Sequence, residues 1–318
     1  MNMTKPRLHP DETTVAVLMG GWSAERNVSL ASGEACFGAL RRAGFNAIMV
    51  DVKRETIHSV LLDMKPEVVF NALHGKWGED GCAAALCETL RIPYTHSGVR
   101  ASAVAMNKEM SKVLFRAANI PVAESKLVDI ELAAEEHALP VPYVIKPVAE
   151  GSSVGVHIVT ESKNGPPKII LEQREIFGER VMAERFVPGR ELTCAVMGDV
   201  ALGVIDIVSK ASGWYDYQSK YAPGGSQHIL PAELSPDLYR KVQLYSLLAH
   251  QALGCRGISR SDFRLDDGPG KEPELIILET NTQPGMTGTS LVPEMAAHAG
   301  HSFEELVTWM VNDASLDR

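Results

Sequence analysis

A short apolar run that stops at two glycines constrains the fold more than any other feature of this sequence. Residues 14–19 (TVAVLM) are rich in β-branched side chains and end at Gly20 and Gly21, and an apolar stripe with helical spacing follows from residue 28 to residue 40. This order predicts a strand, a tight turn and a helix. The next predicted elements are two buried strands and the helix between them, at residues 46–51, 68–72 and 57–64. The pattern favours an open parallel α/β layer, with ligands beyond the carboxyl ends of its strands.

Two later changes of pattern predict two further lobes. Beyond residue 97 the predicted elements are helices at 101–118 and 236–253 and strands at 143–146, 157–160, 181–186, 191–197, 258–265 and 274–281. We therefore expect three domains, at residues 1–97, 98–184 and 185–318. The segment 206–231, rich in Gly, Ser and Tyr, is expected to be a loop that orders over a bound ligand.

Charge and cysteine content exclude several classes of protein. Lys and Arg total 31 against 40 Asp and Glu, and the net charge of −9 argues against nucleic acid or an anionic membrane as a partner. The five cysteines form no CxxC pair, so neither a disulfide framework nor a zinc site is expected. No window approaches ~18 uninterrupted apolar residues. We predict a soluble, cytoplasmic protein.

A dinucleotide-binding fold is the obvious competitor for the first domain. The first predicted strand, however, is followed by GGWSAE and not by the GxGxxG fingerprint. A single pair of glycines is weak evidence for any phosphate site, so the sequence does not favour a nicotinamide cofactor.

The last two predicted strands carry a candidate metal site. Arg260 and Asp262 share one face of their strand, and Glu279 and Asn281 share one face of the next, so a hairpin would bring the two pairs together. A register that pairs Asp262 with Glu279 is available. Carboxylate and amide oxygens suit Mg²⁺. The alternative is a solvated face with a surface ion pair, although the strand before Glu279 is strongly apolar.

Lysines and a glycine-serine segment form a candidate phosphate site. Lys146 ends an apolar run, and the segment 151–155 (GSSVG) offers flexible backbone N–H groups and two hydroxyls. Lys108, on a predicted helix, could join Lys146 in neutralising a polyphosphate. The alternatives are a plain turn and a surface cation.

Two further segments complete the candidate site. Residues 182–187 alternate so that backbone groups lie between apolar side chains, as an adenine pocket requires, and Glu191 could accept hydrogen bonds from ribose. The polar loop 281–293 could hold a carboxylate or an oxyanion with backbone donors and Ser290.

Seven blocks in order carry a family resemblance: GGWSAERNVSLASG, LHGKWGEDG, MNKEMSK, VIKPVAEGSSVGV, ERFVPGREL, YDYQSKY, and GISRSDFRL continuing to LETNTQPGMTGTSLVP. By these blocks the chain resembles the D-alanine–D-alanine ligases of the ATP-grasp superfamily over nearly its whole length. The resemblance implies a three-lobed α/β ATP-grasp architecture, in which an N-terminal open parallel, Rossmann-like domain accompanies two α+β lobes that clamp ATP.

The resemblance also implies an activity and its partners. ATP would phosphorylate the carboxylate of one D-alanine, and the amine of a second would attack the acylphosphate to give D-alanyl-D-alanine for peptidoglycan. Two Mg²⁺ ions are implied, with Mn²⁺ able to replace them, and so is a homodimer. Competing readings are a depsipeptide ligase that takes D-lactate as second substrate and a non-catalytic sensor of nucleotide or amino acid.

Site residues follow from the resemblance, position by position. The implied groups around the reacting atoms are Glu25, linked through Ser152 to Tyr221, with Arg260, the Gly285 N–H and Ser290. His74 and Leu291 would contact substrate, although His74 could equally be an ordinary loop histidine. The implied ATP contacts are Lys108, Lys146, Ser153, Glu184, Arg185, Val187, Glu191 and Lys220. The implied metal ligands are Asp262, Glu279 and Asn281.

Overall fold

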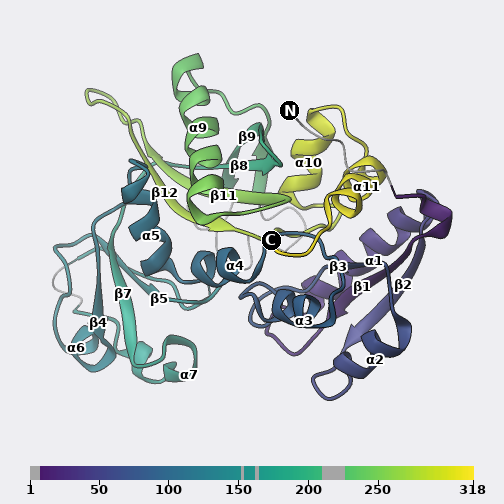
Figure 1. The fold of residues 1–318 in the computed structure, drawn as a ribbon. Coiled ribbons are helices and arrows are strands. Elements are labelled where there is room, and N and C mark those ends of the chain that lie inside the picture. The colour runs from purple at the N-terminus through teal and green to yellow at the C-terminus, as the bar shows by residue number, and fades with distance from the viewer. Residues whose placement is uncertain (1–7, 152–153, 162–164, 210–225) are drawn as a thin grey trace.

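Three β-sheets organise the chain. The computed structural model describes residues 8–151, 154–161, 165–209 and 226–318. Their sheets have three, four and five strands, and helices lie on their outer faces (Figure 1). The predicted α/β fold is confirmed: one sheet is parallel, two are antiparallel, and helices accompany each of them.

The N-terminal sheet is parallel, as predicted, with strand order β2-β1-β3. Its elements are β1 (Thr14–Gly20), α1 (Arg26–Arg42), β2 (Asn46–Val52), α2 (Ile57–Met64), β3 (Val68–Asn71) and α3 (Cys82–Leu90), after a short 3-10 turn at Pro10–Glu12. Gly20 and Gly21 have φ values of +78° and +75°, which only glycine adopts readily. A Cβ at Gly20 would overlap the Asp51 carboxylate. The glycine pair therefore allows the chain to turn tightly from strand to helix.

The middle sheet is antiparallel with order β4-β7-β5-β6. Its elements are β4 (Ser125–Asp129), α6 (Ile130–Glu135), β5 (Tyr143–Pro147), β6 (His157–Val159), a 3-10 turn (Lys168–Leu171), α7 (Arg174–Phe177) and β7 (Arg180–Arg185). Residues of α6, α7 and the inner face of the sheet share one apolar cluster, which includes Ile130, Tyr143 and Phe177.

The C-terminal sheet is also antiparallel, with order β10-β9-β8-β11-β12. Its strands are β8 (Arg190–Met197), β9 (Val200–Ser209), β10 (Ser226–Ile229), β11 (Ile258–Asp266) and β12 (Glu274–Asn281), accompanied by α9 (Pro236–Leu253), α10 (Leu291–His298) and α11 (Phe303–Asp313). The predicted loop 206–231 is wrong at both ends, because β9 continues to Ser209 and pairs with β10. The β-branched side chains of residues 204–208 (VIDIV) favour strand there. Residues 210–225 lie outside the described part.

The predicted single helix over 101–118 is also wrong. It is two helices, α4 (Val99–Met106) and α5 (Lys108–Ala117), separated at Asn107. Asn107 has an extended backbone, and its side-chain oxygen accepts hydrogen bonds from the N–H groups of Glu109 and Met110, both at 3.1 Å. This N-cap satisfies donors that would otherwise be free at the start of α5. Asn107 thereby fixes the direction in which α5 presents its lysines.

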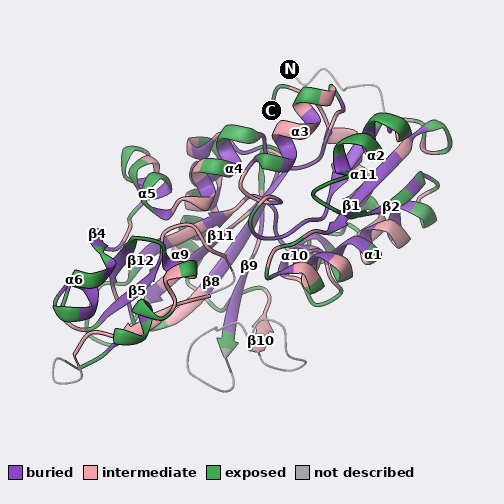
Figure 2. Cartoon of the chain, turned by 90° about the horizontal axis from the view of Figure 1, so that it is seen from below, coloured by how far each residue is buried: buried purple, intermediate pink, exposed green. Residues whose placement is uncertain are grey.

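The core crosses the boundaries between sheets. Val15 and Val17 of β1 share a cluster with Met310 and Val311 of α11, so the end of the chain packs against its beginning. A second cluster joins α4 and α5 to α9 and the hairpin β11–β12. Figure 2 shows the central strands buried and the outward faces of the helices exposed. None of the described helices has the length and apolar character needed to cross a lipid bilayer.

Candidate active site

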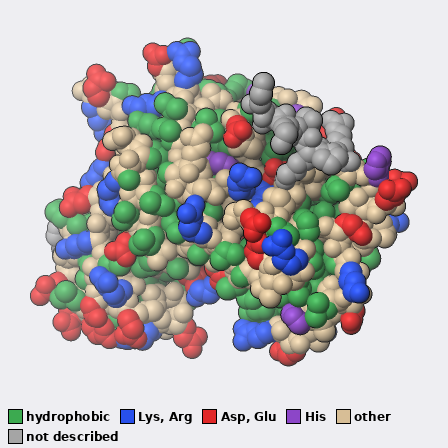
Figure 3. Space-filling model, in the orientation of Figure 1, with side chains coloured by type: hydrophobic (Ala, Val, Ile, Leu, Met, Phe, Trp, Pro, Cys, Tyr) green, Lys and Arg blue, Asp and Glu red, His purple; other side chains and the backbone are tan. Residues whose placement is uncertain are grey.

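Two cavities adjoin where the three sheets meet. The first is lined by N-terminal and C-terminal side chains, among them Glu25, His74, Arg260, Asn281 and Ser290. The second lies between the middle and C-terminal sheets, and its lining includes Lys146, Glu184, Val187, Glu191 and Asp262. Lys108, Glu150, Gly151 and Glu279 line both cavities. A molecule in one cavity would therefore meet a molecule in the other beside Lys108 and Glu279. Figure 3 shows acidic and basic side chains intermingled over the face of the molecule that it draws.

The hairpin β11–β12 adopts the register that the sequence left available. Asp262 lies opposite Glu279 and Arg260 lies opposite Asn281, and a bulge follows Asp262. Asp262 is only 7% exposed, so this is not a solvated face. The antiparallel pairing places two carboxylates and an amide side by side at the junction of the cavities.

Cationic side chains hold both carboxylates. Lys108 Nζ lies 3.0 Å from Glu279 Oε2 and donates a hydrogen bond of 2.6 Å to the Glu150 carbonyl. Arg260 donates two hydrogen bonds to the carboxylate of Asp262, at 2.9 and 2.8 Å. Thr193 Oγ1 donates a third to it at 2.6 Å. Each acid thus has a cationic partner in a partly dry site.

The donor chemistry at this point suits a hard divalent cation. Mg²⁺ usually takes one or two carboxylates, and substrate phosphates and water complete its shell. Asp262, Glu279 and the amide of Asn281 offer such a set. Within the described residues no three His, Cys, Asp or Glu side chains gather around one point. The set therefore fits a metal that shares its shell with a ligand.

A buried charge cluster lies at the second cavity. Glu184 on β7 accepts a hydrogen bond of 2.9 Å from Lys146 on β5, and Lys112 Nζ of α5 lies 2.6 Å from its other carboxylate oxygen. Burial acts to raise the pKa of Glu184, but Lys146 and Lys112 hold it below its usual value. Lys112 was not among the predicted site residues. Its spacing of four residues from Lys108 on one helix was the available signal.

A second missed residue, Arg264, shapes the wall of this cavity. Its guanidinium donates to the carbonyls of Val187 and Gly189 at 3.0 and 2.8 Å and lies 3.5 Å from Glu191. Burial lowers the pKa of Arg264 against the opposing effect of Glu191. Arg264 thus holds the turn between β7 and β8, which includes Val187 and directly precedes the strand that carries Glu191. Arg185 also lines the cavity and pairs with Glu274.

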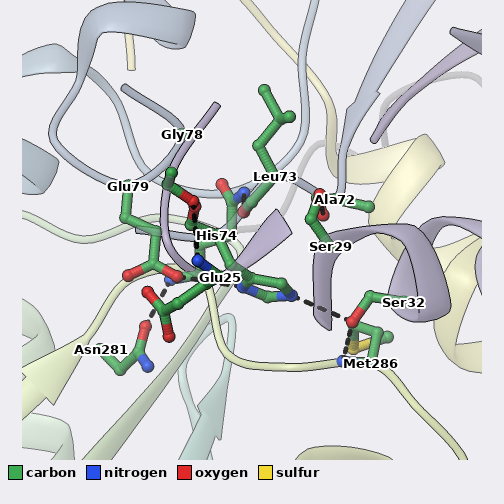
Figure 4. A network of polar contacts seen from close by, with 12 residues as sticks. Glu25, Ser29, Ser32, Ala72, Leu73, His74, Gly78, Glu79, Asn281 and Met286 are labelled. Atoms are coloured by element: carbon green, nitrogen blue, oxygen red, sulfur yellow. Dashed lines mark hydrogen bonds and ion pairs between the residues drawn. The ribbon is translucent and has the colours of Figure 1, made fainter. Parts of the chain in front are cut away.

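His74 is held from both sides (Figure 4). Its Nδ1 lies 3.0 Å from Glu79 and its Nε2 lies 3.0 Å from Ser32 Oγ, which also accepts from the Met286 N–H at 3.2 Å. Glu25, at the start of α1, and Asn281 lie around His74 in the first cavity. His74 therefore has a hydrogen-bond partner at each ring nitrogen and also lines the first cavity.

A buried amide pair joins two loops of this cavity and was also missed. Asn71 Nδ2 donates to Gln283 Oε1 at 2.5 Å and to the Gly78 carbonyl at 3.0 Å. Gln283 Nε2 donates to the Leu73 carbonyl, and the Gln283 N–H donates to Asn281 Oδ1 at 3.0 Å. The loop after β3 is thereby tied to the loop after β12.

The loop after β12 ends at Ser290, which precedes α10. The Thr287 N–H donates to Ser290 Oγ at 2.9 Å, and a Cβ at Gly285 would lie only 2.9 Å from the same oxygen. Gly285, Ser290 and Leu291 all line the first cavity. Four predicted site residues, Ser152, Ser153, Lys220 and Tyr221, lie outside the described residues.

Comparison with known proteins gives one consistent family. A family model described as D-ala D-ala ligase C-terminus matches residues 114–312. The D-alanine–D-alanine ligase of Methylobacterium radiotolerans is 60% identical over 96% of this chain and 99% of its own length. The enzyme of that name from Xanthobacter autotrophicus is also 60% identical with the same coverage. A structure of D-alanine–D-alanine ligase from Bacillus anthracis in complex with ATP is similar with a TM-score of 0.78 and 26% identity, covering 95% of this chain and 97% of that one.

Proposed function

This chain belongs to the D-alanine–D-alanine ligase family, and we infer from that membership that it joins two molecules of D-alanine with the use of ATP. The observation that carries this conclusion is the pair of adjoining cavities that meet at Lys108 and Glu279. One cavity suits a nucleotide and the other suits amino acids. The reacting phosphate and carboxylate would then meet beside the facing acids of the hairpin.

We propose that ATP lies in the second cavity. Lys146 and Lys108 would contact its phosphates, Glu184 and the backbone through Val187 its adenine, and Glu191 its ribose. The burial of Glu184 and Val187 supports this placement, because adenine binds in a dry slot. Ser153, Arg185 and Lys220 are the remaining proposed contacts. Asp262, Glu279 and Asn281 would hold two Mg²⁺ ions, or Mn²⁺ in their place, and the bound metal would offset phosphate charge.

We propose that the amino acids lie in the first cavity. Glu25 would bind the ammonium of the first D-alanine, in a chain that continues through Ser152 to Tyr221, and His74 would contact the same substrate. Arg260 and the Gly285 N–H would donate to the oxyanion that develops when the second amine attacks the acylphosphate. Ser290 and the Leu291 N–H would hold the carboxylate of the second D-alanine. The position of all these described groups around one cavity supports the assignment.

We further propose that the product serves peptidoglycan synthesis and that the chain works in the cytoplasm as a homodimer. Its partners would be D-alanine and ATP, without nucleic acid or membrane. We also propose domain boundaries at residues 97 and 184. The three sheets support a three-lobed division, although α4 and α5 pack on the C-terminal sheet.

Product analysis tests the function. The purified chain, given ATP, Mg²⁺ and D-alanine, is expected to release ADP and phosphate in step with D-alanyl-D-alanine. A parallel reaction that adds D-lactate, run from acidic to alkaline pH, tests the depsipeptide alternative. A depsipeptide that dominates near neutral pH would contradict the peptide assignment. Phosphate release that does not depend on D-alanine, or no phosphate release at all, would support a non-catalytic sensor of nucleotide or amino acid instead.

The amide pair between the two substrate loops yields a prediction. Gln283→Met removes the hydrogen bonds to Asn71 and the Leu73 carbonyl, so the loop that carries Gly285 and Ser290 loses its anchor. We expect the KM for D-alanine to rise roughly tenfold, because small misplacements at a reacting centre have large kinetic effects. The KM for ATP should change less than about twofold.

Gln243→Met is the matched control for this prediction. Gln243 donates one hydrogen bond of 2.9 Å to the Leu202 carbonyl and lines neither cavity. Its loss should cost ~1 kcal/mol of stability and leave both KM values in place. Equal kinetic effects of the two substitutions would show that Gln283 has no positioning role.

A further inference from the structure

Lys112 is a lysine with no access to solvent. It lies on α5, one helical turn after Lys108, and has 0% of its surface exposed. An ionised lysine is rarely buried without a partner, and here Glu184 Oε2 lies 2.6 Å from its Nζ. The side chain does not line either cavity. Lys112 therefore does not contact a ligand in either cavity, and its effect on such a ligand would act through Glu184.

Glu184 is shared between two lysines that come from different parts of the fold. Val144 of β5 is paired with Glu184 of β7, so Lys146 lies two residues along on the same face of the sheet. Lys146 takes Oε1 at 2.9 Å, while Lys112 approaches Oε2 from α5. Each carboxylate oxygen thus has its own cation. The three charged groups are 2%, 0% and 7% exposed for Glu184, Lys112 and Lys146, so water screens them weakly.

Lys112 changes the net charge of the cluster. Lys146 and Glu184 alone would form a neutral pair, and the positive charge of Lys146 would be compensated from within the protein. With Lys112 the cluster carries one net positive charge. Lys146 and Glu184 line the second cavity and Lys112 does not, so Lys146 is the cation of this cluster that faces the cavity.

We propose that Lys112 is a positioning residue for the nucleotide site: it neutralises Glu184 from behind, so that Lys146 presents an uncompensated positive charge to the phosphates of the bound nucleotide. The inference rests on the proposed function, since it takes ATP to be the ligand of the second cavity. It assigns a role in phosphate binding to a side chain that never touches the nucleotide. Lys112 acts by charge at a distance, and its effect should therefore grow with the number of phosphates.

The test measures affinities for ATP, ADP and adenosine by calorimetry, with the full chain and without D-alanine. In Lys112→Met we expect the affinity for ATP to fall roughly tenfold and that for adenosine less than about threefold, with ADP between them. The ratio of the adenosine Kd to the ATP Kd is the decisive quantity, because loss of an adenine contact affects both ligands alike. An equal loss for all three ligands would indicate a merely structural lysine and would overturn the proposal.

The double variant Lys112→Met/Glu184→Gln makes the test sharper. It removes one positive and one negative charge, which restores the net charge of the cluster, so the ratio should return to that of the unmodified chain. A ratio that stays low, or falls further, would contradict the charge argument. If Lys112→Met does not fold, Glu184→Gln alone serves: its ratio should equal or exceed that of the unmodified chain, and a lower ratio overturns the proposal.

Arg116→Met is the matched control. Arg116 follows Lys112 by one turn on α5, is exposed, and donates a hydrogen bond of 3.4 Å to Ser125 Oγ. Its removal takes one positive charge from the same helix and should leave the affinity ratio unchanged. If the unmodified chain fails to bind ATP, the proposed function fails. If it binds ATP and forms product but Lys112→Met keeps the normal ratio, only the role of Lys112 fails.

Discussion

Glu279→Gln is expected to lower kcat by ~10² or more, because it removes a charge from the point where the nucleotide and amino acid cavities meet. Glu279 lines both cavities, faces Asp262 across the hairpin and lies 3.0 Å from Lys108. The glutamine keeps the size of the side chain. It leaves Asp262 as the one carboxylate of the pair that can offer its charge to a metal. Steady-state rates with saturating ATP and D-alanine, at several Mg²⁺ concentrations, measure the effect.

Glu274→Gln is the matched control on the same strand. Glu274 lies at the other end of β12, pairs with Arg185 near the surface, and its side chain is 44% exposed. Its kcat should stay within about twofold of the unmodified value, since exposed ion pairs contribute little. Near-normal turnover in Glu279→Gln would count against the metal assignment at the hairpin.

Arg260→Lys is expected to lower kcat by ~10², although the charge is conserved. Removing one oxyanion donor typically costs 10²–10³ in rate. Arg260 holds the Asp262 carboxylate with two hydrogen bonds and also lines the amino acid cavity, which a single ammonium on a flexible chain cannot do in the same geometry. The measurement is kcat together with the KM for each substrate.

Arg264→Lys provides the contrast for Arg260, four residues along the same strand. Arg264 lines the nucleotide cavity and holds the carbonyls of Val187 and Gly189. Its substitution should raise the KM for ATP and leave kcat nearly unchanged. The Mg²⁺ dependence distinguishes Glu279→Gln from Arg260→Lys, because only Glu279→Gln should change the Mg²⁺ concentration that the reaction requires. Similar kinetics for Arg260→Lys and Arg264→Lys would argue against an oxyanion role for Arg260.

Much of the fold could be predicted from the sequence because its signals are local. The apolar run before the glycine pair predicted β1 of the parallel sheet, and the strand periods of β11 and β12 placed Asp262 and Glu279 on faces that a hairpin could bring together. The register itself stayed open at the sequence level, and the structure fixes it. The break at Asn107 was not predicted, because a helical apolar stripe continues across it. The strands at the two ends of the segment 206–231 were not predicted either.

Most strands and several helices could be predicted from local patterns, since the spacing of apolar residues and the backbone needs of glycine act over a few positions. The contacts of Lys112 with Glu184 and of Asn71 with Gln283 emerge only in the folded chain. Each of these pairs joins elements far apart in the chain, and their meeting depends on how sheets and helices pack in three dimensions. A buried charge or amide pairs with whichever group the packing brings within reach, and no local sequence period encodes that partner.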